Sequence, residues 1–215
     1  MEAAPTLYQI EDRLRAALDD PTPRPDVPDA LAPRPRRSWR AGVVPSPTRP
    51  AAALVLLYPI DARVHLVLTR RAATLGRHAG QISLPGGAVD AHETLEAAAL
   101  REAREEVGVG TDPRVVGRLT PLHIPVSNFA LHPVAAVADR RPRFVAAAEE
   151  VAHVLEVPLD DLRGAGARRS GWSWRGDEMI AVPYFEAQGE RVWGATAMVL
   201  GELIHLLEAD GGDGA

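Results

Sequence analysis

The feature that most constrains this chain is a helix-forming segment, residues 94 to 107, that carries three acidic side chains on one face. At about 100° per residue around a helix axis, Glu102, Glu105 and Glu106 point to the same side. Carboxylates at i, i+3 and i+4 repel one another, and they lie near the helix C-terminus, where the partial charge is already negative. The positive charge of a divalent cation would offset both effects. Carboxylate oxygens suit a hard cation such as Mg²⁺ or Mn²⁺.

These three glutamates support two interpretations. Mg²⁺ keeps several waters and takes substrate phosphates, so the face is typical of a phosphate or diphosphate site. There the metal would lower the pKa of a bound water, and a neighbouring carboxylate could accept the proton. The alternative is a solvated face, because the run from 101 to 106 mixes charges as exposed helices do.

The spacing of the flanking residues favours the metal site. Gly87 is followed after five residues by Glu93, and after seven more by the run R-E-A-R-E-E-V-G-V at 101 to 109. This resembles the Nudix box, G-x5-E-x7-R-E-U-x-E-E-x-G-U, where U is a bulky apolar residue. One position departs from the pattern, since Ala103 stands at the first U. Gly108 is expected to close the helix in a left-handed conformation.

The resemblance implies an α+β protein with the Nudix fold, an α/β/α sandwich with a mixed sheet and a catalytic loop-helix-loop. It also implies a Nudix pyrophosphatase that uses Mg²⁺ or Mn²⁺. Its catalytic residues would be Arg101, which orients carboxylates, and the metal ligands Glu102, Glu105 and Glu106, with Glu93 in a structural or outer position. Gly86 and Gly87 would let backbone approach the metal and phosphates closely.

A second motif stands directly upstream, at residues 67 to 87. It is similar to the motif of the coenzyme A pyrophosphatase subfamily, L-L-T-x-R-S-x-x-L-R-x-H-x-G-Q-x-x-F-P-G-G. The main departures are Ala72, Gly76 and Leu84. Residues 127 to 134 and 193 to 197 also resemble subfamily segments, so the resemblance covers roughly residues 40 to 207. It implies hydrolysis of coenzyme A or its derivatives to 3',5'-ADP and 4'-phosphopantetheine.

Coenzyme A carries a diphosphate and a 3'-phosphate, so its pocket should offer cations and hydrogen-bond donors. In a strand over 67 to 71, Arg70 and Arg71 point to opposite faces, and only one of them can enter the site; Arg71 holds the patterned position. Arg77 could supply the charge that the motif places at position 76. The predicted substrate-binding residues are Arg70, Arg71, Arg77, His78, Gln81, Gly86 and Gly87.

Several alternatives stay open from the sequence. Glu149 and Glu150 could serve as general base or be solvated residues at a strand start. The aromatic residues Trp172, Trp174, Tyr184 and Trp193 are expected in the core or an interface, although one of them could stack on adenine. The rival functions are a Nudix hydrolase of ADP-ribose, NADH or a nucleoside triphosphate, and a non-catalytic Nudix-fold nucleotide sensor.

The resemblance implies a small-molecule nucleotide as the partner, and composition bears on which other partners are excluded. A net charge of -5 argues against a general nucleic-acid binder, and the absence of cysteine excludes disulfides and thiolate catalysis. All 24 basic residues are arginine, so a single arginine is a weak signal. The N-terminus lacks a secretion signal, and the longest apolar run, 51 to 60, is too short to span a membrane. A cytoplasmic protein is expected, and a homodimer is compatible with the sequence.

The apolar pattern predicts the order of the elements. Residues 1 to 38 should form a helix, with a stripe of Leu7, Ile10, Leu14 and Leu18, and an extended Pro/Arg-rich arm packed on the domain. The hydrolase domain should span 39 to 208, and 209 to 215 a flexible tail. Strands are predicted at 51–57 and 64–69, which should pair, and at 115–122, 129–138, 152–157 and 179–185. The pattern breaks at 85 to 87, and an amphipathic helix closes the domain at 195 to 207.

Overall fold

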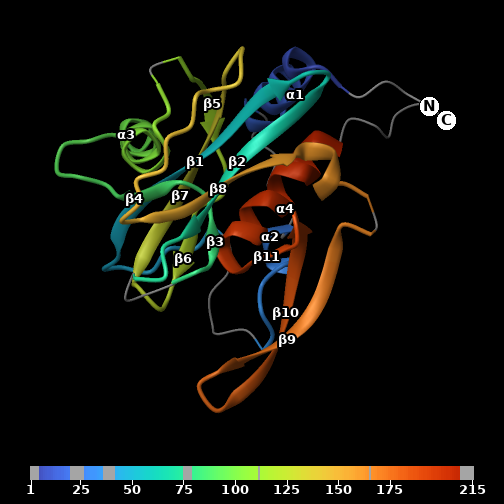
Figure 1. The fold of residues 1–215 in the computed structure, drawn as a ribbon. Helices are drawn as coiled ribbons and strands as arrows, with labels where there is room; N and C mark the ends of the chain where they lie inside the picture. The colour runs from blue at the N-terminus through green and yellow to red at the C-terminus, as the bar shows by residue number, and fades with distance from the viewer. Residues whose placement is uncertain are drawn as a thin grey trace.

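A mixed β-sheet lies between two layers of helix, and a smaller sheet stands beside it (Figure 1). The computed structural model describes residues 5–19, 27–35, 42–74, 79–110, 112–164 and 166–208. The helices are α1 (Leu7–Asp19), α2 (Val27–Ala30), α3 (Leu95–Val107) and α4 (Gly194–Glu208), with a 3₁₀ turn at Leu159–Leu162. The larger sheet holds β1 (Arg49–Ile60), β2 (Arg63–Arg71), β3 (Ile82–Ser83), β4 (Gly86–Ala88), β5 (Arg114–Arg118), β6 (Leu122–Ile124), β7 (Phe129–Val137) and β8 (Val151–Pro158). The smaller sheet holds β9 (Arg168–Arg175), β10 (Glu178–Ala187) and β11 (Glu190–Trp193).

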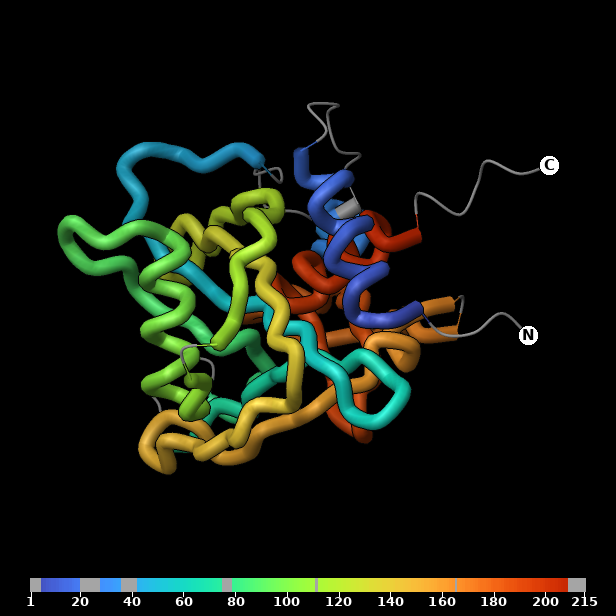
Figure 2. The backbone as a smooth tube through the Cα atoms, turned by 90° about the horizontal axis from the view of Figure 1, so that it is seen from above, coloured from blue at the N-terminus to red at the C-terminus, as the bar shows by residue number. Residues whose placement is uncertain are grey.

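Strand β1 explains why helices cover both faces of the larger sheet. Its side chains alternate, as in any strand, but both sets are apolar and buried. Val55 and Leu57 pack in one cluster with α1 and α4, whereas Leu54 and Leu56 pack in a second cluster with α3. Figure 2 shows α3 on one side of the strands and α1 and α4 on the other. The predicted α/β/α arrangement is confirmed.

The larger sheet is mixed, because β1 runs parallel to β7 and antiparallel to β2. The predicted pairing of residues 51–57 with 64–69 is therefore correct, and both strands extend beyond those bounds. The sequence pattern predicted that residues 86 and 87 only interrupt the strands, and this prediction is wrong. They belong to β4, which pairs with β1 through Ala53↔Gly86 and Ala52↔Gly87. Glycine permits this pairing, since a Cβ at Gly86 would lie 2.4 Å from the carbonyl oxygen of Ala52.

Local signals set the two ends of α3. The side chain of Thr94 accepts a hydrogen bond from the Ala97 amide at the N-cap, and Gly108 closes the helix with a φ of 73°. The face toward the sheet carries small side chains, among them the fully buried Ala98, Ala99 and Ala103. Helix α3 packs against β1 and β4. The alanine at the first bulky position of the motif therefore sits in a close helix–sheet contact.

Other parts of the structure differ from the predictions. The predicted extended arm contains the short helix α2, in which Pro28 and Asp29 occupy the first turn, where both residue types are tolerated; positions 21–26 and 36–38 lie outside the described residues. Helix α4 is buried on nearly every side and not amphipathic, because α1, α2, β10 and β11 all pack against it. Strands β6, β9 and β11 were not predicted, since they are short or rich in polar residues and glycine.

Within the described residues, no helix combines the length and apolarity needed to cross a membrane.

Candidate active site

Glu106 is the most buried of the three glutamates on α3. Its side chain is 4% exposed, and Oε2 accepts a hydrogen bond from the Gly86 amide at 3.2 Å. The Arg71 guanidinium lies 3.9 Å from Oε1. Burial, together with the nearby carboxylates of Glu102 and Glu150, raises the pKa of Glu106 to about 7 against the opposing effects of Gly86 and Arg71. A bound cation would therefore stabilise the ionised form of this buried carboxylate.

Glu102 meets the second glycine of the pair. A Cβ on Gly87 would lie 2.5 Å from the Glu102 carboxylate, so only glycine leaves room for that carboxylate against β4. Burial raises the pKa of Glu102, although Arg101 lowers it through a hydrogen bond of 2.8 Å from Nη1. The glycine pair thus brings the Gly86 amide and the carboxylates of Glu102 and Glu106 together at the start of β4.

Arg101 organises the carboxylates around α3. Its Nε donates to Glu93 at 3.0 Å, its Nη1 donates to Glu102 and to Glu105 at 3.1 Å, and its Nη2 donates to the Ala88 carbonyl at 2.9 Å. These bonds lower the pKa of Glu93 and tie the helix to β4. Glu105 remains the most exposed of the three glutamates, at 59%.

The three glutamates do not form a ready-made metal cage. Among the described residues, no group of three or more His, Asp or Glu side chains is placed so that it could hold a metal ion. Arg101 draws Glu102 and Glu105 toward itself, while the Gly86 amide holds Glu106. The donors nevertheless suit a hard divalent cation, because they are carboxylate oxygens and because Glu106 is buried without a full counter-charge.

The loop before β8 brings a fourth carboxylate to this site. The amides of Val145 and Ala147 donate to the carbonyls of Val107 and Glu106, so the loop caps the C-terminal end of α3. Glu150 follows, and its charge acts on both Glu102 and Glu106. No comparable effect on the glutamates involves Glu149 within the described part of the chain, although Glu149 and Glu150 are both exposed.

A cavity of about 970 Å³ opens beside the glycine pair. Its walls come from the larger sheet, the loop at 125–127 after β6, the β9–β10 hairpin and the first turn of α4. Three arginines line it, namely Arg49, Arg71 and Arg175, and no Asp or Glu occurs among its described lining residues. Since the chain carries 29 acidic and 24 basic residues, a largely apolar wall whose charged side chains are all arginine is a local exception that suits an anionic ligand.

The structure brings some of the predicted substrate-binding residues together and leaves others apart. Arg71, Gln81, Gly86 and Gly87 all line the cavity. Arg70 lies outside it, where its guanidinium pairs with Glu190 at 3.0 Å, as the alternation of side chains along β2 requires. Arg77 and His78 lie outside the described residues.

The aromatic residues divide in a similar way. Tyr184 is buried, in agreement with the predicted core position, but Trp172 and Trp174 are 69% and 67% exposed and do not belong to the core. They project from the same face of β9, because they are two residues apart. Trp174 and Trp193 line the cavity.

The sequence did not single out Arg49, Ser173 or Arg175 as cavity residues. In a chain whose basic residues are all arginine, Arg49 and Arg175 carry no distinguishing signal. They reach the cavity only through tertiary folding, from the start of β1 and from the tip of the β9–β10 hairpin.

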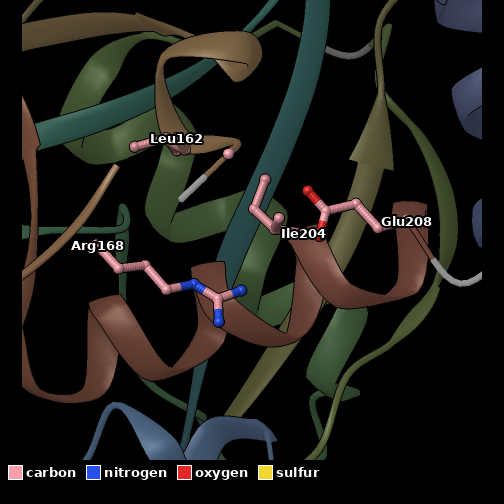
Figure 3. Close-up of a pocket in the computed structure, with 5 residues that line it drawn as sticks. Leu162, Arg168, Ile204 and Glu208 are labelled. Atoms are coloured by element: carbon pink, nitrogen blue, oxygen red, sulfur yellow. The ribbon is translucent and has the colours of Figure 1, made fainter. Parts of the chain in front are cut away.

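A second pocket is less suited to an anionic substrate. Figure 3 shows it beside the C-terminal end of α4, where Leu162, Arg168, Ile204 and Glu208 line about 270 Å³ together with Gly164. It offers one cation and one carboxylate, and it contains none of the residues predicted from the motifs.

Fold and site define a class of protein: a mixed-sheet α/β/α protein that presents carboxylates from a glycine-bounded helix beside a cation-lined cavity. This chain belongs to the Nudix family and is a Nudix hydrolase. The NUDIX domain model matches residues 47–177. Members of this family generally use divalent metal cations and act on small nucleotide substrates.

Relatives agree with this membership. The chain is 37% identical over 157 residues to the uncharacterized Nudix hydrolase NudL of Citrobacter koseri. The match covers 72% of this chain and 81% of the relative. It is 40% identical over 159 residues to the protein of the same name from Cronobacter sakazakii, with the same coverage. A MutT/nudix family protein from Enterococcus faecalis shares the fold, with a TM-score of 0.53 at 19% identity over 77% of this chain and 64% of that one.

Substitution of the two glycines by alanine should separate stability from activity. A Cβ at Gly86 would meet the backbone of Ala52 and Ala53, which cannot move aside, so G86A is expected to lower the free energy of unfolding by about 1–3 kcal/mol. A Cβ at Gly87 would meet only the carboxylate end of Glu102, which can rotate. G87A should therefore fold with near-normal stability but lose activity, because Glu102 is displaced.

Urea unfolding and turnover measured on the same preparations would test this pair. Gly110 is a matched control, because its φ is not positive and nothing lies within 4 Å of an added Cβ. G110A should leave both quantities unchanged. Equal effects of G86A and G87A on stability would contradict the difference proposed between the two positions.

Proposed function

We propose that this chain hydrolyses the diphosphate linkage of coenzyme A or its derivatives and releases 3',5'-ADP and 4'-phosphopantetheine. The cofactor would be Mg²⁺ or Mn²⁺, held by Glu102, Glu105 and Glu106. The observation that carries the proposal is the cavity with three arginines and no acidic lining residue among those described, which begins at the glycine pair next to Glu102 and Glu106.

Residues that resemble the coenzyme A pyrophosphatase subfamily surround this cavity. Arg71 and Gln81 come from the upstream motif, and Arg71 lies beside Glu106. The segments at 127–134 and 193–197, which also resemble the subfamily, contribute Ser127, Phe129, Leu131, Trp193, Gly194, Ala195 and Thr196. A volume of about 970 Å³ lies near the upper end of the range for ligand pockets, about 300–1,000 Å³, as a ligand the size of coenzyme A requires.

Each residue has a role that its contacts support. The bound metal would neutralise charge on the diphosphate and activate a water. Arg101 orients the glutamates through its four hydrogen-bonded partners. Arg71 binds a diphosphate oxygen near Glu106, and Glu150 accepts the proton of the attacking water, because its carboxylate acts on both Glu102 and Glu106. The Gly86 and Gly87 backbone lets the diphosphate approach this face.

The arm would belong to the same functional unit. Ala32 and Pro33 line the cavity, and Arg34 forms an isolated bridge with Ala181 of β10. Residues 1–38 would then be an N-terminal helix and a Pro/Arg-rich arm that pack on a hydrolase domain of residues 39–208.

Incubation with a substrate panel tests the proposal. Coenzyme A, ADP-ribose, NADH and nucleoside triphosphates would be compared at equal concentration with Mg²⁺ and with Mn²⁺, and products identified by mass. We expect a kcat/KM for coenzyme A at least about tenfold above the others, and no turnover in excess EDTA. A clear preference for any other compound would overturn the substrate assignment, and turnover in EDTA would overturn the metal requirement.

A further inference from the structure

The cavity carries a cation far from the glutamates. Arg175 is the last residue of β9, at the tip of the β9–β10 hairpin, and it lines the cavity together with Ser173. These two residues share a face of the strand, because they are two positions apart. In Figure 1 the hairpin tip projects away from α3 and β4, which carry the glutamates and the glycine pair.

The Arg175 side chain is fixed in place but not fully hydrogen-bonded. Its Nη1 donates to the Pro35 carbonyl of the arm at 3.2 Å, and its Nη2 donates to the exposed Glu178. Its Nε is buried and has no hydrogen-bond partner among the described residues, a property it shares with Arg71. Because this donor is unsatisfied, the charge of the guanidinium is only partly compensated, and an anion in the cavity beside Arg175 would be favoured.

The other two arginines of the cavity have different surroundings. Arg71 lies beside Glu106 and is suited to the phosphates that react there. Arg49 is exposed, and its guanidinium lies over the Phe129 ring at 4.9 Å from the centroid. Arg175 is held more firmly and is only 25% exposed, which strengthens its interaction with an anion relative to that of a solvated arginine.

We propose that Arg175 and Ser173 form a second anion subsite, which binds a phosphate monoester of the substrate outside the diphosphate that is cleaved. The subsite lies at the hairpin end of the cavity, away from the carboxylate face. This inference rests on the proposed function, under which the group bound there is the 3'-phosphate of coenzyme A. Arg175 is thus a specificity-determining residue, and it does not take part in the chemical step.

Comparison of coenzyme A with dephospho-coenzyme A, which lacks the 3'-phosphate, tests the subsite. The wild-type protein should prefer coenzyme A. In R175Q we expect kcat/KM for coenzyme A to fall at least about tenfold, mostly through KM, because a hydrogen bond to a charged group is lost. The value for dephospho-coenzyme A should stay within about twofold of wild type. R175K, which retains the charge, should keep part of the preference.

Arg169 supplies a matched control on the same strand. It pairs with Glu186 across the hairpin and does not line the cavity, so R169Q should leave the preference intact. An equal loss for both substrates in R175Q would indicate a purely structural role and overturn the proposal. So would loss of the preference in R49Q but not in R175Q.

A binding measurement separates this inference from the proposed function. By calorimetry, wild type should bind 3',5'-ADP more tightly than 5'-AMP, and R175Q should bind the two nucleotides equally. If wild type hydrolyses neither form of coenzyme A, the proposed function fails, yet this difference in affinity still supports the subsite. If coenzyme A is hydrolysed but the two nucleotides bind wild type equally, the subsite is wrong and the proposed function stands.

Discussion

Replacement of Glu106 by glutamine is expected to reduce turnover at least about a hundredfold. Glutamine preserves the volume of the side chain and can still accept a hydrogen bond from the Gly86 amide, so the packing at this buried position should survive. The substitution removes the negative charge that we propose binds the metal. That charge lies next to the Arg71 guanidinium. Turnover at saturating substrate, measured over a range of Mg²⁺ concentrations, would test this expectation.

Glu96 offers a matched control on the same helix. It lies in the first turn of α3, is partly exposed and pairs with Arg118 at 3.4 Å, away from the glycine pair. E96Q should retain turnover within about twofold of wild type. If E106Q kept wild-type turnover at every Mg²⁺ concentration, the assignment of Glu106 as a metal ligand would be wrong.

Helix α3 was predictable because its signals are local. Thr94 caps its first turn, Gly108 ends it in a left-handed conformation, and apolar residues at helical spacing face the sheet. The spacing from Gly87 to Val109 fixed the class of protein on these residues alone, and the family match agrees. The alternation of side chains along β2 is equally local, so it correctly predicted that Arg70 and Arg71 point to opposite faces.

The arrangement of the carboxylates within that helix was not predictable. Helical spacing places Glu102, Glu105 and Glu106 on one face, but it does not specify which hydrogen-bond donor each carboxylate binds. Arg101 binds two of them, while a backbone amide from β4 binds the third. That difference depends on the pairing of β4 with β1, which the sequence pattern at residues 85 to 87 did not predict.

The wall of the cavity could not be predicted for a related reason. It combines residues 32–33, the start of β1, the end of β6 with the loop after it (123–127), the hairpin tip and the first turn of α4, which are distant in the sequence. Strand β9 has little apolar character, with the sequence RRSGWSWR, so neither the strand nor Arg175 could be recognised. Only the packing of the smaller sheet beside the larger one creates this part of the site.

In the metal-free protein, ionisation of Glu106 should remove about 3 kcal/mol of stability as the pH rises from about 4.5 to above 7. Burial raises the pKa of Glu106 from 4.5 to about 7. Between these values the native state binds one more proton than the unfolded state, so the free energy of unfolding falls as the pH rises. The contribution of Glu106 is complete below its unfolded pKa and is lost as the pH passes through its folded pKa.

Urea unfolding in EDTA between about pH 5 and pH 8 would measure this effect, with E106Q as the reference, because other titrating groups largely cancel in the difference. E106Q should be the more stable protein at the upper end of this range, since it never places a charge at the buried position.

Mg²⁺ should weaken or reverse the pH dependence of wild type alone, because a cation favours the ionised carboxylate. Parallel curves for the two proteins in EDTA would show that Glu106 is not held at a raised pKa. A response of E106Q to Mg²⁺ equal to that of wild type would show that the cation binds elsewhere. The same carboxylate thus links the stability of the metal-free fold to the metal dependence proposed for catalysis.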